Sequence, residues 1–168
     1  NFNCTIIRPA TVCGFSRRQR LDLVVNILSN LAYNNKKIKI FGGNQLRPNI
    51  NIYDMCQSYL HVLSQPVDKI NGEIFNVGYE NYTVTEIANL VKDSMPFNVS
   101  VEKVKTDDNR SYHISSEKIK KKIGFMNKKT IKDAVDELVV AFKKNLFLKP
   151  LSNEMYFNIK RMKEIDLK

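Results

Sequence analysis

Short segments with strand character alternate with segments of helical periodicity along most of this chain, and this alternation restricts the possible folds most strongly. Residues 5–7 predict a buried strand that stops at Arg8-Pro9, because proline lacks the N–H group that a strand donates. Apolar residues then recur at helical spacing from Leu21 to Ala32, which predicts a helix ending near residue 35. Such alternation is typical of the α/β class.

Capping signals mark the ends of several later helices. Thr83 and Thr130 each precede an acidic residue by three positions, the spacing of a capping box. Asp54 is expected to cap a helix that Pro66 closes, and Gly124 to stop a short helix that begins near residue 116. Residues 38–41, 50–52, 73–77 and 99–104 are the further strands that we expect.

The length and composition favour one ordinary domain with a real core, since the chain has 168 residues and 43% hydrophobic content. No apolar run approaches the roughly 20 residues of a membrane-spanning helix, and the first residues lack the pattern of a secretory signal. We therefore expect a cytoplasmic protein. The chain starts at Asn1 without an initiator Met, so we also expect it to be cut from a longer protein.

The cysteines and histidines give no sign of a metal site. Cys4, Cys13 and Cys56 are odd in number and lack metal-binding spacing, so we expect them to be reduced, buried and apolar in character. His61 lies among apolar residues of a predicted helix, where a structural role is favoured. No metal-binding residue is therefore predicted.

The formal net charge of +10 would suit an anionic partner such as nucleic acid, a membrane surface or a phosphate-bearing metabolite. Lysine greatly outnumbers arginine, and asparagine and isoleucine are abundant, as a coding bias toward A and T would produce. The lysine clusters at residues 120–122 and 128–129 lie on or beside amphipathic helices. A solvated helix face is therefore favoured over a nucleic-acid patch, and we expect neither a nucleic acid nor a membrane as partner.

Four segments occur in an order and at spacings that resemble one enzyme family. Each is weak alone, and Cys13 stands where the family commonly has an aromatic residue. Together they resemble the extended short-chain dehydrogenase/reductase family, specifically its nucleotide-sugar epimerases and dehydratases, over roughly residues 3–145. The segments are Arg8–Gly14, Ile40–Asp54, Ile74–Gly78, and Asp107–Tyr112 followed by Lys118.

The resemblance implies a fold and a function. Residues 1–145 would form the C-terminal part of a Rossmann-type NAD(P)-binding fold with a small substrate-binding lobe, and residues 146–168 a C-terminal extension that is an extra helix or a partly ordered tail. The implied enzyme is an epimerase (an isomerase) or a dehydratase that acts on a nucleotide-diphosphate sugar through a transient keto-sugar. Its cofactor would be NAD or NADP, and a homodimer is expected.

Arginines carry the substrate site that the resemblance implies. Arg47 and Arg110 match family arginines that contact the diphosphate, and a planar guanidinium can bind two phosphate oxygens at once. The alternative is a pair of surface arginines bound to nearby carboxylates. Asp108 is expected to contact a ribose or to pair with Arg110.

The strand end at residues 9–11 matches the segment that passes the nicotinamide ring in this family. Pro9 and Ala10 are the implied cofactor contacts and Thr11 an implied substrate contact, although a simple strand terminus would have the same sequence. Asn26 interrupts an apolar helix face, so it is expected either to bind substrate or to make a buried hydrogen bond. Asn76 lies in an otherwise apolar strand, where its amide needs hydrogen-bond partners.

Two family signatures have no credible match. The Gly-rich dinucleotide fingerprint does not occur, and the catalytic Tyr-x-x-x-Lys pair matches only by coincidence at Tyr33 with Lys37 and at Tyr156 with Lys160. We therefore expect the catalytic residues upstream of Asn1 and an inactive, poorly folding fragment. Two alternatives stay open: a non-catalytic nucleotide-sugar or dinucleotide-binding member of the same fold, and a basic nucleic-acid-binding module.

Overall fold

Strands and helices alternate along the chain, and the computed structural model describes residues 2–107 and 110–167. The strands are β1 (Ile6–Pro9), β2 (Thr11–Cys13), β3 (Lys37–Phe41), β4 (Leu46–Asn51), β5 (Ile74–Val77), β6 (Glu80–Thr83) and β7 (Ser100–Val104). The helices are α1 (Val24–Asn35), α2 (Ile52–Leu63), α3 (Val67–Ile70), α4 (Val84–Asp93), α5 (Glu117–Ile123), α6 (Ile131–Lys143), the 3₁₀ helix η1 (Glu154–Tyr156) and α7 (Asn158–Glu164).

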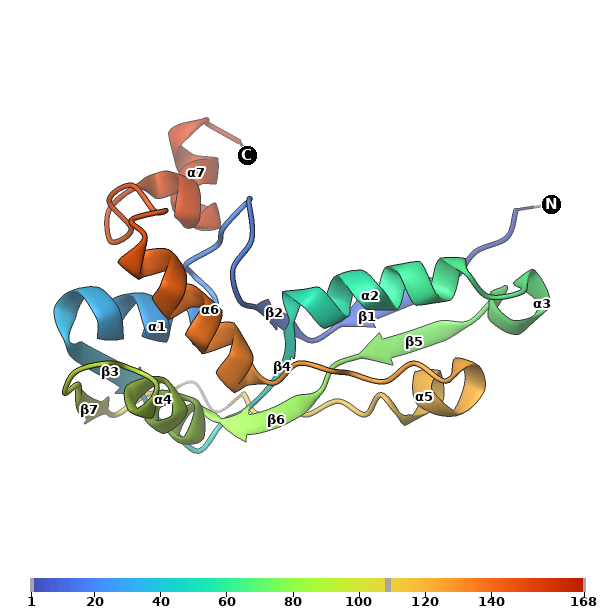
Figure 1. Cartoon of the computed structure of the whole chain (residues 1–168), viewed down its shortest axis with the longest axis horizontal. Helices are drawn as coiled ribbons and strands as arrows, with labels where there is room; N and C mark the ends of the chain where they lie inside the picture. The colour runs from blue at the N-terminus through green and yellow to red at the C-terminus, as the bar shows by residue number, and fades with distance from the viewer. Residues whose placement is uncertain (1, 108–109, 168) are drawn as a thin grey trace.

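Within the described residues, the strands form three small sheets (Figure 1). The pairs β1–β5, β2–β4 and β3–β7 are parallel, and β6 adds to β4 in the antiparallel direction. A parallel pair needs a long crossover between its strands, and helices lie in each of these crossovers. The predicted α/β class is confirmed.

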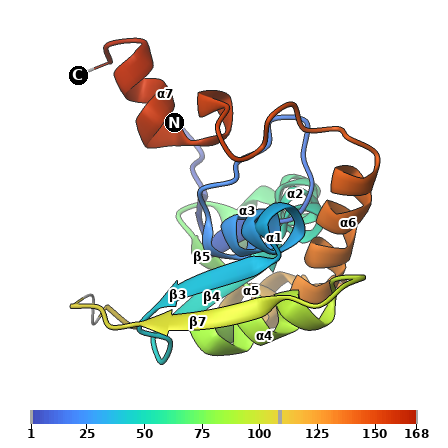
Figure 2. The same cartoon turned by 90° about the vertical axis from the view of Figure 1, so that its left-hand side faces the viewer.

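Helices α1, α4 and α6 pack together with strand β3, and we call these four elements the closed region. Its core residues Val25, Ile38, Ile87 and Val135 are fully buried. Figure 2 shows β3 and β7 side by side, with α4 beneath β7 and α6 to the right of the strands. One apolar face from each helix therefore meets the others around a common core.

Strands β1 and β5 with helix α2 form a second unit, which we call the open region. Phe75 and Val77 of β5 are fully buried on one side of the strand pair. On the other side, Ile6 is 45% exposed and its cross-strand partner Ile74 is 36% exposed. Helix α2 also exposes apolar side chains, with Leu63 at 79%. The open region is thus covered on one face only.

The predicted capping signals are confirmed at three helix ends. Thr83 and Glu86 form a complete capping box at α4, and Thr130 and Asp133 form another at α6. Gly124 ends α5 with φ of 76°, a left-handed conformation that costs glycine little. These ends depend on residues within one turn of each other, which is why the sequence predicts them.

The start of α2 differs from the prediction. Asn51 is the N-cap, and its side chain accepts a hydrogen bond from the Tyr53 N–H at 2.8 Å. Asp54 lies in the first turn, is 1% exposed, and accepts from the backbone N–H groups of Lys128 at 3.0 Å and Lys129 at 2.8 Å. Asp54 therefore connects α2 to the segment before α6 and does not cap its own helix.

Three elements were not predicted, and one begins later than expected. Strands β2 and β6 and the single turn α3 lie in segments where no strand or helix was expected. Helix α1 begins at Val24, because residues 21–23 instead connect it to the preceding loop. Strand β6 exists through its pairing with β4, a tertiary contact that local sequence does not encode.

Several side chains differ from expectation in their exposure. Asn76 is exposed, since β5 is uncovered on that face, and it does not need buried partners. The cysteines are free, as predicted, but only Cys13 is buried while Cys4 and Cys56 are exposed. His61 places Nε2 2.6 Å from the Ile123 carbonyl oxygen, which confirms its structural role.

The C-terminal segment is ordered and packs against the closed region. Phe147 is buried beside Phe142 of α6, with ring centres 5.0 Å apart, and it also contacts the Tyr156 ring at 5.9 Å. The extra helix is therefore confirmed as α7, whereas a boundary at residue 146 stays a prediction. In the part of the chain that the structure describes, no helix is long and apolar enough to cross a membrane.

Candidate functional site

Two recesses contain the predicted ligand-binding residues or lie beside them. We call the first the strand-end recess, of about 350 Å³, and the second the lysine recess, of about 680 Å³. The strand-end recess is lined by Pro9–Gly14, Ser16, Arg18, Arg20, Leu23, Asn26 and Ile52. The lysine recess is lined by Gly42, Asn44, Gln45, Lys103–Asp107 and Ser111.

The strand-end recess brings together four of the predicted site residues. Pro9 is exposed, Ala10 is buried and Thr11 is half-buried, and all three line the recess with Asn26. The Ala10 N–H donates to the Val77 carbonyl at 2.7 Å, which fixes the backbone between β1 and β2. Small side chains at this turn leave room for a flat ring to approach the backbone.

Asn26 has a structural task in this recess. Its Oδ1 accepts from the Gly14 N–H at 3.1 Å, and its Nδ2 donates to the Arg20 carbonyl at 2.8 Å. Gly14 has φ of 106°, a conformation that glycine adopts without strain. The buried amide thus holds both ends of the loop at residues 14–20, as the buried hydrogen-bond alternative expects.

Cys13 also lines the strand-end recess, but it is not poised as a nucleophile. Burial raises the pKa of the Cys13 thiol, and the nearby carboxylates of Glu80 and Glu137 raise it further. Its Sγ donates to the Ile50 carbonyl at 3.4 Å. A thiol whose pKa is raised stays protonated at neutral pH, and the thiol form is a poor nucleophile.

Arg47 and Arg110 are brought together by the structure. Arg47 is half-buried in β4, and its Nη1 donates to the Arg110 carbonyl at 2.5 Å and to the Leu46 carbonyl at 3.0 Å. The Arg47 guanidinium carbon lies 5.7 Å from the centre of the Tyr112 ring. Its position is therefore set by the segment that carries Arg110.

That segment is held against β4 by further contacts. The Leu46 N–H donates to Ser111 Oγ at 2.9 Å, and the Tyr112 N–H reaches the Leu46 carbonyl at 3.5 Å. Arg110 is exposed, which leaves its side chain in contact with solvent. Asp108, another predicted site residue, lies outside the described residues.

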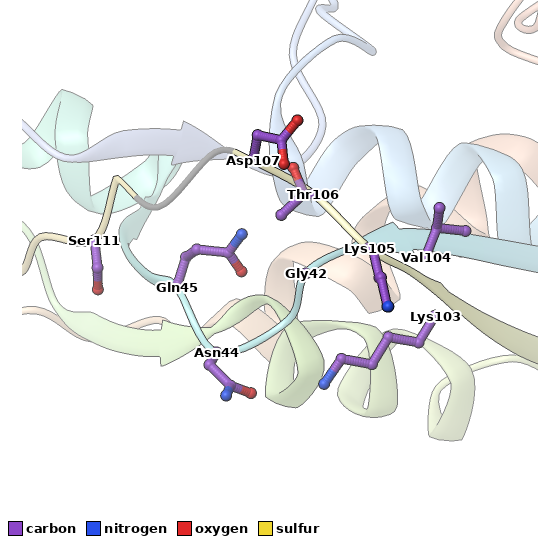
Figure 3. Close-up of a pocket in the computed structure, with 9 residues that line it drawn as sticks. All are labelled: Gly42, Asn44, Gln45, Lys103, Val104, Lys105, Thr106, Asp107 and Ser111. Carbon is purple, nitrogen blue, oxygen red and sulfur yellow. The ribbon is translucent and has the colours of Figure 1, made fainter.

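The lysine recess lies between the turn at residues 42–45 and the end of β7. Figure 3 shows Lys103 and Lys105 extending from the β7 side toward that turn. Gln45 Oε1 accepts from the Gly43 N–H at 2.6 Å and so stabilises the turn. Gly42 has φ of 75°, and a Cβ atom there would lie 2.3 Å from Gln45 Nε2, so any other residue would strain the backbone and displace the Gln45 side chain.

The strand register relates the two groups of predicted residues. Thr11 of β2 pairs with Asn49 of β4, and Arg47 precedes Asn49 by two residues on the same strand. Alternate residues of a strand project from the same face, roughly 6.6 Å apart, so Thr11 and Arg47 lie on one face of this sheet. A ligand lying along β4 could contact both.

Four basic residues of these recesses were not predicted: Arg18, Arg20, Lys103 and Lys105. Lys103 lies near the end of the strand predicted at residues 99–104 and Lys105 just beyond it, and a spacing of two in extended backbone places both side chains on one face. The high lysine content concealed that signal. The arginines lie in the polar loop after the first predicted strand, where their distance from the site depends on tertiary packing.

Comparison with known proteins agrees with the sequence resemblance. Residues 1–78 match the family model described as the NAD dependent epimerase/dehydratase family, in agreement with the predicted resemblance over that part of the chain. The structure is similar to UDP-glucose 4-epimerase from Thermotoga maritima, with a TM-score of 0.70 and 23% identity over 87% of this chain and 48% of that chain. It is equally similar to dTDP-glucose 4,6-dehydratase from Bacillus anthracis, with a TM-score of 0.70 and 24% identity over 87% of this chain and 47% of the other.

A third similar structure is UDP-glucuronic acid 4-epimerase from Bacillus cereus, with a TM-score of 0.70 and 20% identity over 85% of this chain and 46% of that chain. The chain thus spans about half the length of the solved structures that it matches. At these levels of identity the likeness shows the fold, and the predicted relation to part of a Rossmann-type fold is confirmed.

Proposed function

We propose that this chain, whose first 78 residues match the NAD dependent epimerase/dehydratase family, is the substrate-binding half of an NAD-dependent nucleotide-sugar epimerase or dehydratase. The enzyme would act through a transient keto-sugar. The observation that carries the proposal is the contact between Arg47 Nη1 and the Arg110 carbonyl at 2.5 Å, which places two arginine-bearing segments together. Both segments adjoin the lysine recess, through Gln45 and Ser111.

A nucleotide diphosphate fits the chemistry of this area. Guanidinium groups bind phosphate oxygens in pairs, and lysine ammonium groups add positive charge without a fixed geometry. Arg47, Arg110, Lys103 and Lys105 would hold the diphosphate, with the nucleoside in the lysine recess. The sugar would then extend along β4 toward Thr11 and the strand-end recess.

The residues of this chain fit one end of a dinucleotide cofactor. Pro9 and Ala10, at the wall of the strand-end recess, would hold the nicotinamide of NAD or NADP. The bound cofactor supplies reversible hydride transfer with a sugar carbon. The Gly-rich loop that binds a cofactor pyrophosphate does not occur in this sequence, so Pro9, Ala10 and Thr11 would orient the reacting ends only.

Proton transfer would depend on residues outside this sequence, and we expect the chain alone to be inactive. The partners of the full-length protein would be a nucleotide-diphosphate sugar and a second copy of the enzyme. Nucleic acid is not a proposed partner, because exposed lysines such as Lys118 and Lys122 form ion pairs with Glu73 on the α5 face. We expect the enzyme to be cytoplasmic.

The test is mass spectrometry of nucleotide sugars incubated with the full-length protein and NAD. We expect conversion of one UDP- or dTDP-sugar, and an increase in KM of about tenfold or more for Arg47→Ala, since a charge-assisted contact to phosphate is lost. Arg161→Ala is the control, because Arg161 pairs only with Glu164 on α7 among the described residues. Binding of a nucleotide sugar without turnover would instead favour a non-catalytic member of the same fold.

A further inference from the structure

The loop that lines the strand-end recess is attached to the C-terminal segment. The Leu21 N–H donates to the Tyr156 carbonyl at 2.9 Å, and the Leu21 side chain is fully buried. At the other end of the loop, the rings of Phe15 and Phe147 lie 5.8 Å apart. Apolar packing and a backbone hydrogen bond therefore fix both ends of the loop against residues 147–156.

Arg18 of this loop is held by uncharged acceptors. Its Nη1 donates to the Gln19 carbonyl at 3.2 Å and to the Met155 carbonyl at 3.1 Å, and its Nη2 approaches Asn158 Oδ1 at 3.4 Å. No carboxylate group is found in the lining of the strand-end recess among the described residues. The positive charge of Arg18 is thus kept at the recess by the C-terminal segment.

Asp22 connects the second recess arginine to the same segment. Its Oδ1 accepts from Arg20 Nε at 2.9 Å, while its Oδ2 accepts from Arg20 Nη2 at 3.1 Å and from the Asn158 N–H at 2.9 Å. Burial alone would raise the pKa of Asp22, but the hydrogen bonds from Arg20 and Asn158 outweigh it and lower the pKa. The carboxylate is therefore ionised at neutral pH and binds both partners.

We propose that Asp22 and Asn158 are positioning residues of the strand-end recess, which hold Arg18 and Arg20 in the orientation that the sugar end of the ligand requires. The role of the ligand rests on the proposed function, whereas the mechanical coupling of residues 153–158 to the loop does not. Asp22 does not line the recess and acts through Arg20. The C-terminal segment thereby becomes a determinant of the sugar site.

One substitution can weaken the coupling without breaking α7. Asn158 is the first residue of that helix, where proline is well tolerated, and Phe157 before it is extended, with φ of −125° and ψ of 102°. Asn158→Pro deletes the N–H that donates to Asp22 and the side-chain contact to Arg18. Asn158→Ala is the matched control, because it keeps the N–H group.

A second variant tests the coupling independently, in case Asn158→Pro misfolds. Asp22→Asn keeps the size of the side chain and weakens the pairing with both Arg20 and Asn158. Its control is Asp136→Asn, which removes an ion pair with Lys132 on the exposed surface of α6. If Asp22→Asn and its control changed the melting temperature equally, the effect would be a general loss of charge. That result would overturn the positioning role of Asp22.

The first measurement is amide hydrogen exchange of the full-length protein without ligand. In Asn158→Pro and Asp22→Asn we expect residues 147–158 and the loop at residues 14–20 to exchange about tenfold faster together, with residues 37–46 unchanged, as coupled local opening requires. A released C-terminal segment beside an unchanged loop would overturn the proposal. Unchanged exchange in both segments would overturn it as well.

The second measurement separates the sugar end from the phosphate end. For the nucleotide sugar that the enzyme converts, KM is expected to rise about tenfold in both variants while the inhibition constant of free UDP or dTDP changes by less than about twofold, as expected for loss of one charge-assisted contact. Equal changes in both constants would overturn a role confined to the sugar end. If no nucleotide sugar binds, the proposed function fails, and the exchange measurement still decides the coupling.

Discussion

The closed and open regions obey the same packing rules with different results. Around β3, helices α1, α4 and α6 enclose one core, and Ile38, Ile87 and Val135 are completely buried in it. In the open region, Phe75 is equally buried, yet Ile74 beside it in the same strand is 36% exposed. The difference is one of coverage, because the closed region has protein around its whole core and the open region has it on one side.

This difference teaches where the chain can accept more protein. Parallel strands of Rossmann-type sheets are covered on both faces, and large exposed apolar areas mark contact surfaces. The outer face of β1 and β5, which carries Ile6 and Ile74, and the exposed side of α2, where Leu60 is 59% and Leu63 is 79% exposed, are two candidate areas of this kind. Under the proposed function, the remainder of the enzyme packs on the open region, and the closed region stays as it is.

The largest expected effect comes from comparing two side-chain truncations to alanine, one in each region. Ile87→Ala should lower the free energy of unfolding by about 3 kcal/mol, because it leaves a cavity in the closed core. Leu63→Ala in the same 168-residue chain should cost less than about 0.5 kcal/mol, since that side chain is already in solvent. Urea denaturation followed by circular dichroism measures both values.

The full-length protein gives the control for this pair. There, Leu63→Ala should cost about 2 kcal/mol or more if the open region is covered, while the effect of Ile87→Ala stays the same. An equally small effect of Leu63→Ala in the full-length protein would show that α2 remains exposed and would break the comparison.

The second test concerns the link between the two regions. Asp54→Asn removes the charge from a buried group of the open region that accepts from Lys128 and Lys129, just before α6 of the closed region. We expect a loss of about 2 kcal/mol, as for a charge-assisted hydrogen bond in a buried site. Asp68→Asn, on the exposed surface of α3, serves as the control. A single cooperative transition in the wild type that splits into two in Asp54→Asn would sharpen the distinction between the regions.

The smallest test lies inside the closed region and depends on pH. Burial raises the pKa of Glu137 above its ordinary value of 4.5, although Lys129 opposes the shift. Folding therefore favours the protonated acid, and the stability gained below pH 4.5 is lost as pH rises through the folded-state pKa. Glu137→Gln should stabilise the protein at pH 7 by less than about 1 kcal/mol, given its partial exposure, and have no effect at pH 4. Thermal melts at the two pH values decide this, and a destabilised variant at pH 7 would contradict it.

The parts of the fold that depend on neighbouring residues were predictable from sequence. The boxes at Thr83 and Thr130 and the stop at Gly124 satisfy backbone groups within a single turn, so their residue types identify them. Strand β6 and the contact of Asp54 with residues 128–129 depend on segments far apart in the chain. No local pattern distinguishes a capping aspartate from one that accepts hydrogen bonds from a distant segment.

The candidate site was predictable in its centre and not at its edges. Resemblance to a family singled out residues 9–11 and Arg47, and the register of β2 with β4 brings these segments onto neighbouring strands. The C-terminal segment holds Arg18 at the strand-end recess through the Met155 carbonyl. The weak hydrophobic periodicity of that segment did not predict where it packs. Their roles in binding stay predictions until the variants are measured.

The long separation between paired strands has a consequence for synthesis on the ribosome. Among the described residues, strand β1 pairs with β5 and β3 pairs with β7, so these two pairs cannot form until residues 74–77 and 100–104 have been made. Closing such long loops is slow compared with forming a helix. Residues 6–9 therefore stay unpaired with β5 while residues 10–73 are made, and an unpaired strand edge on a nascent chain is a site for chaperone binding and for aggregation.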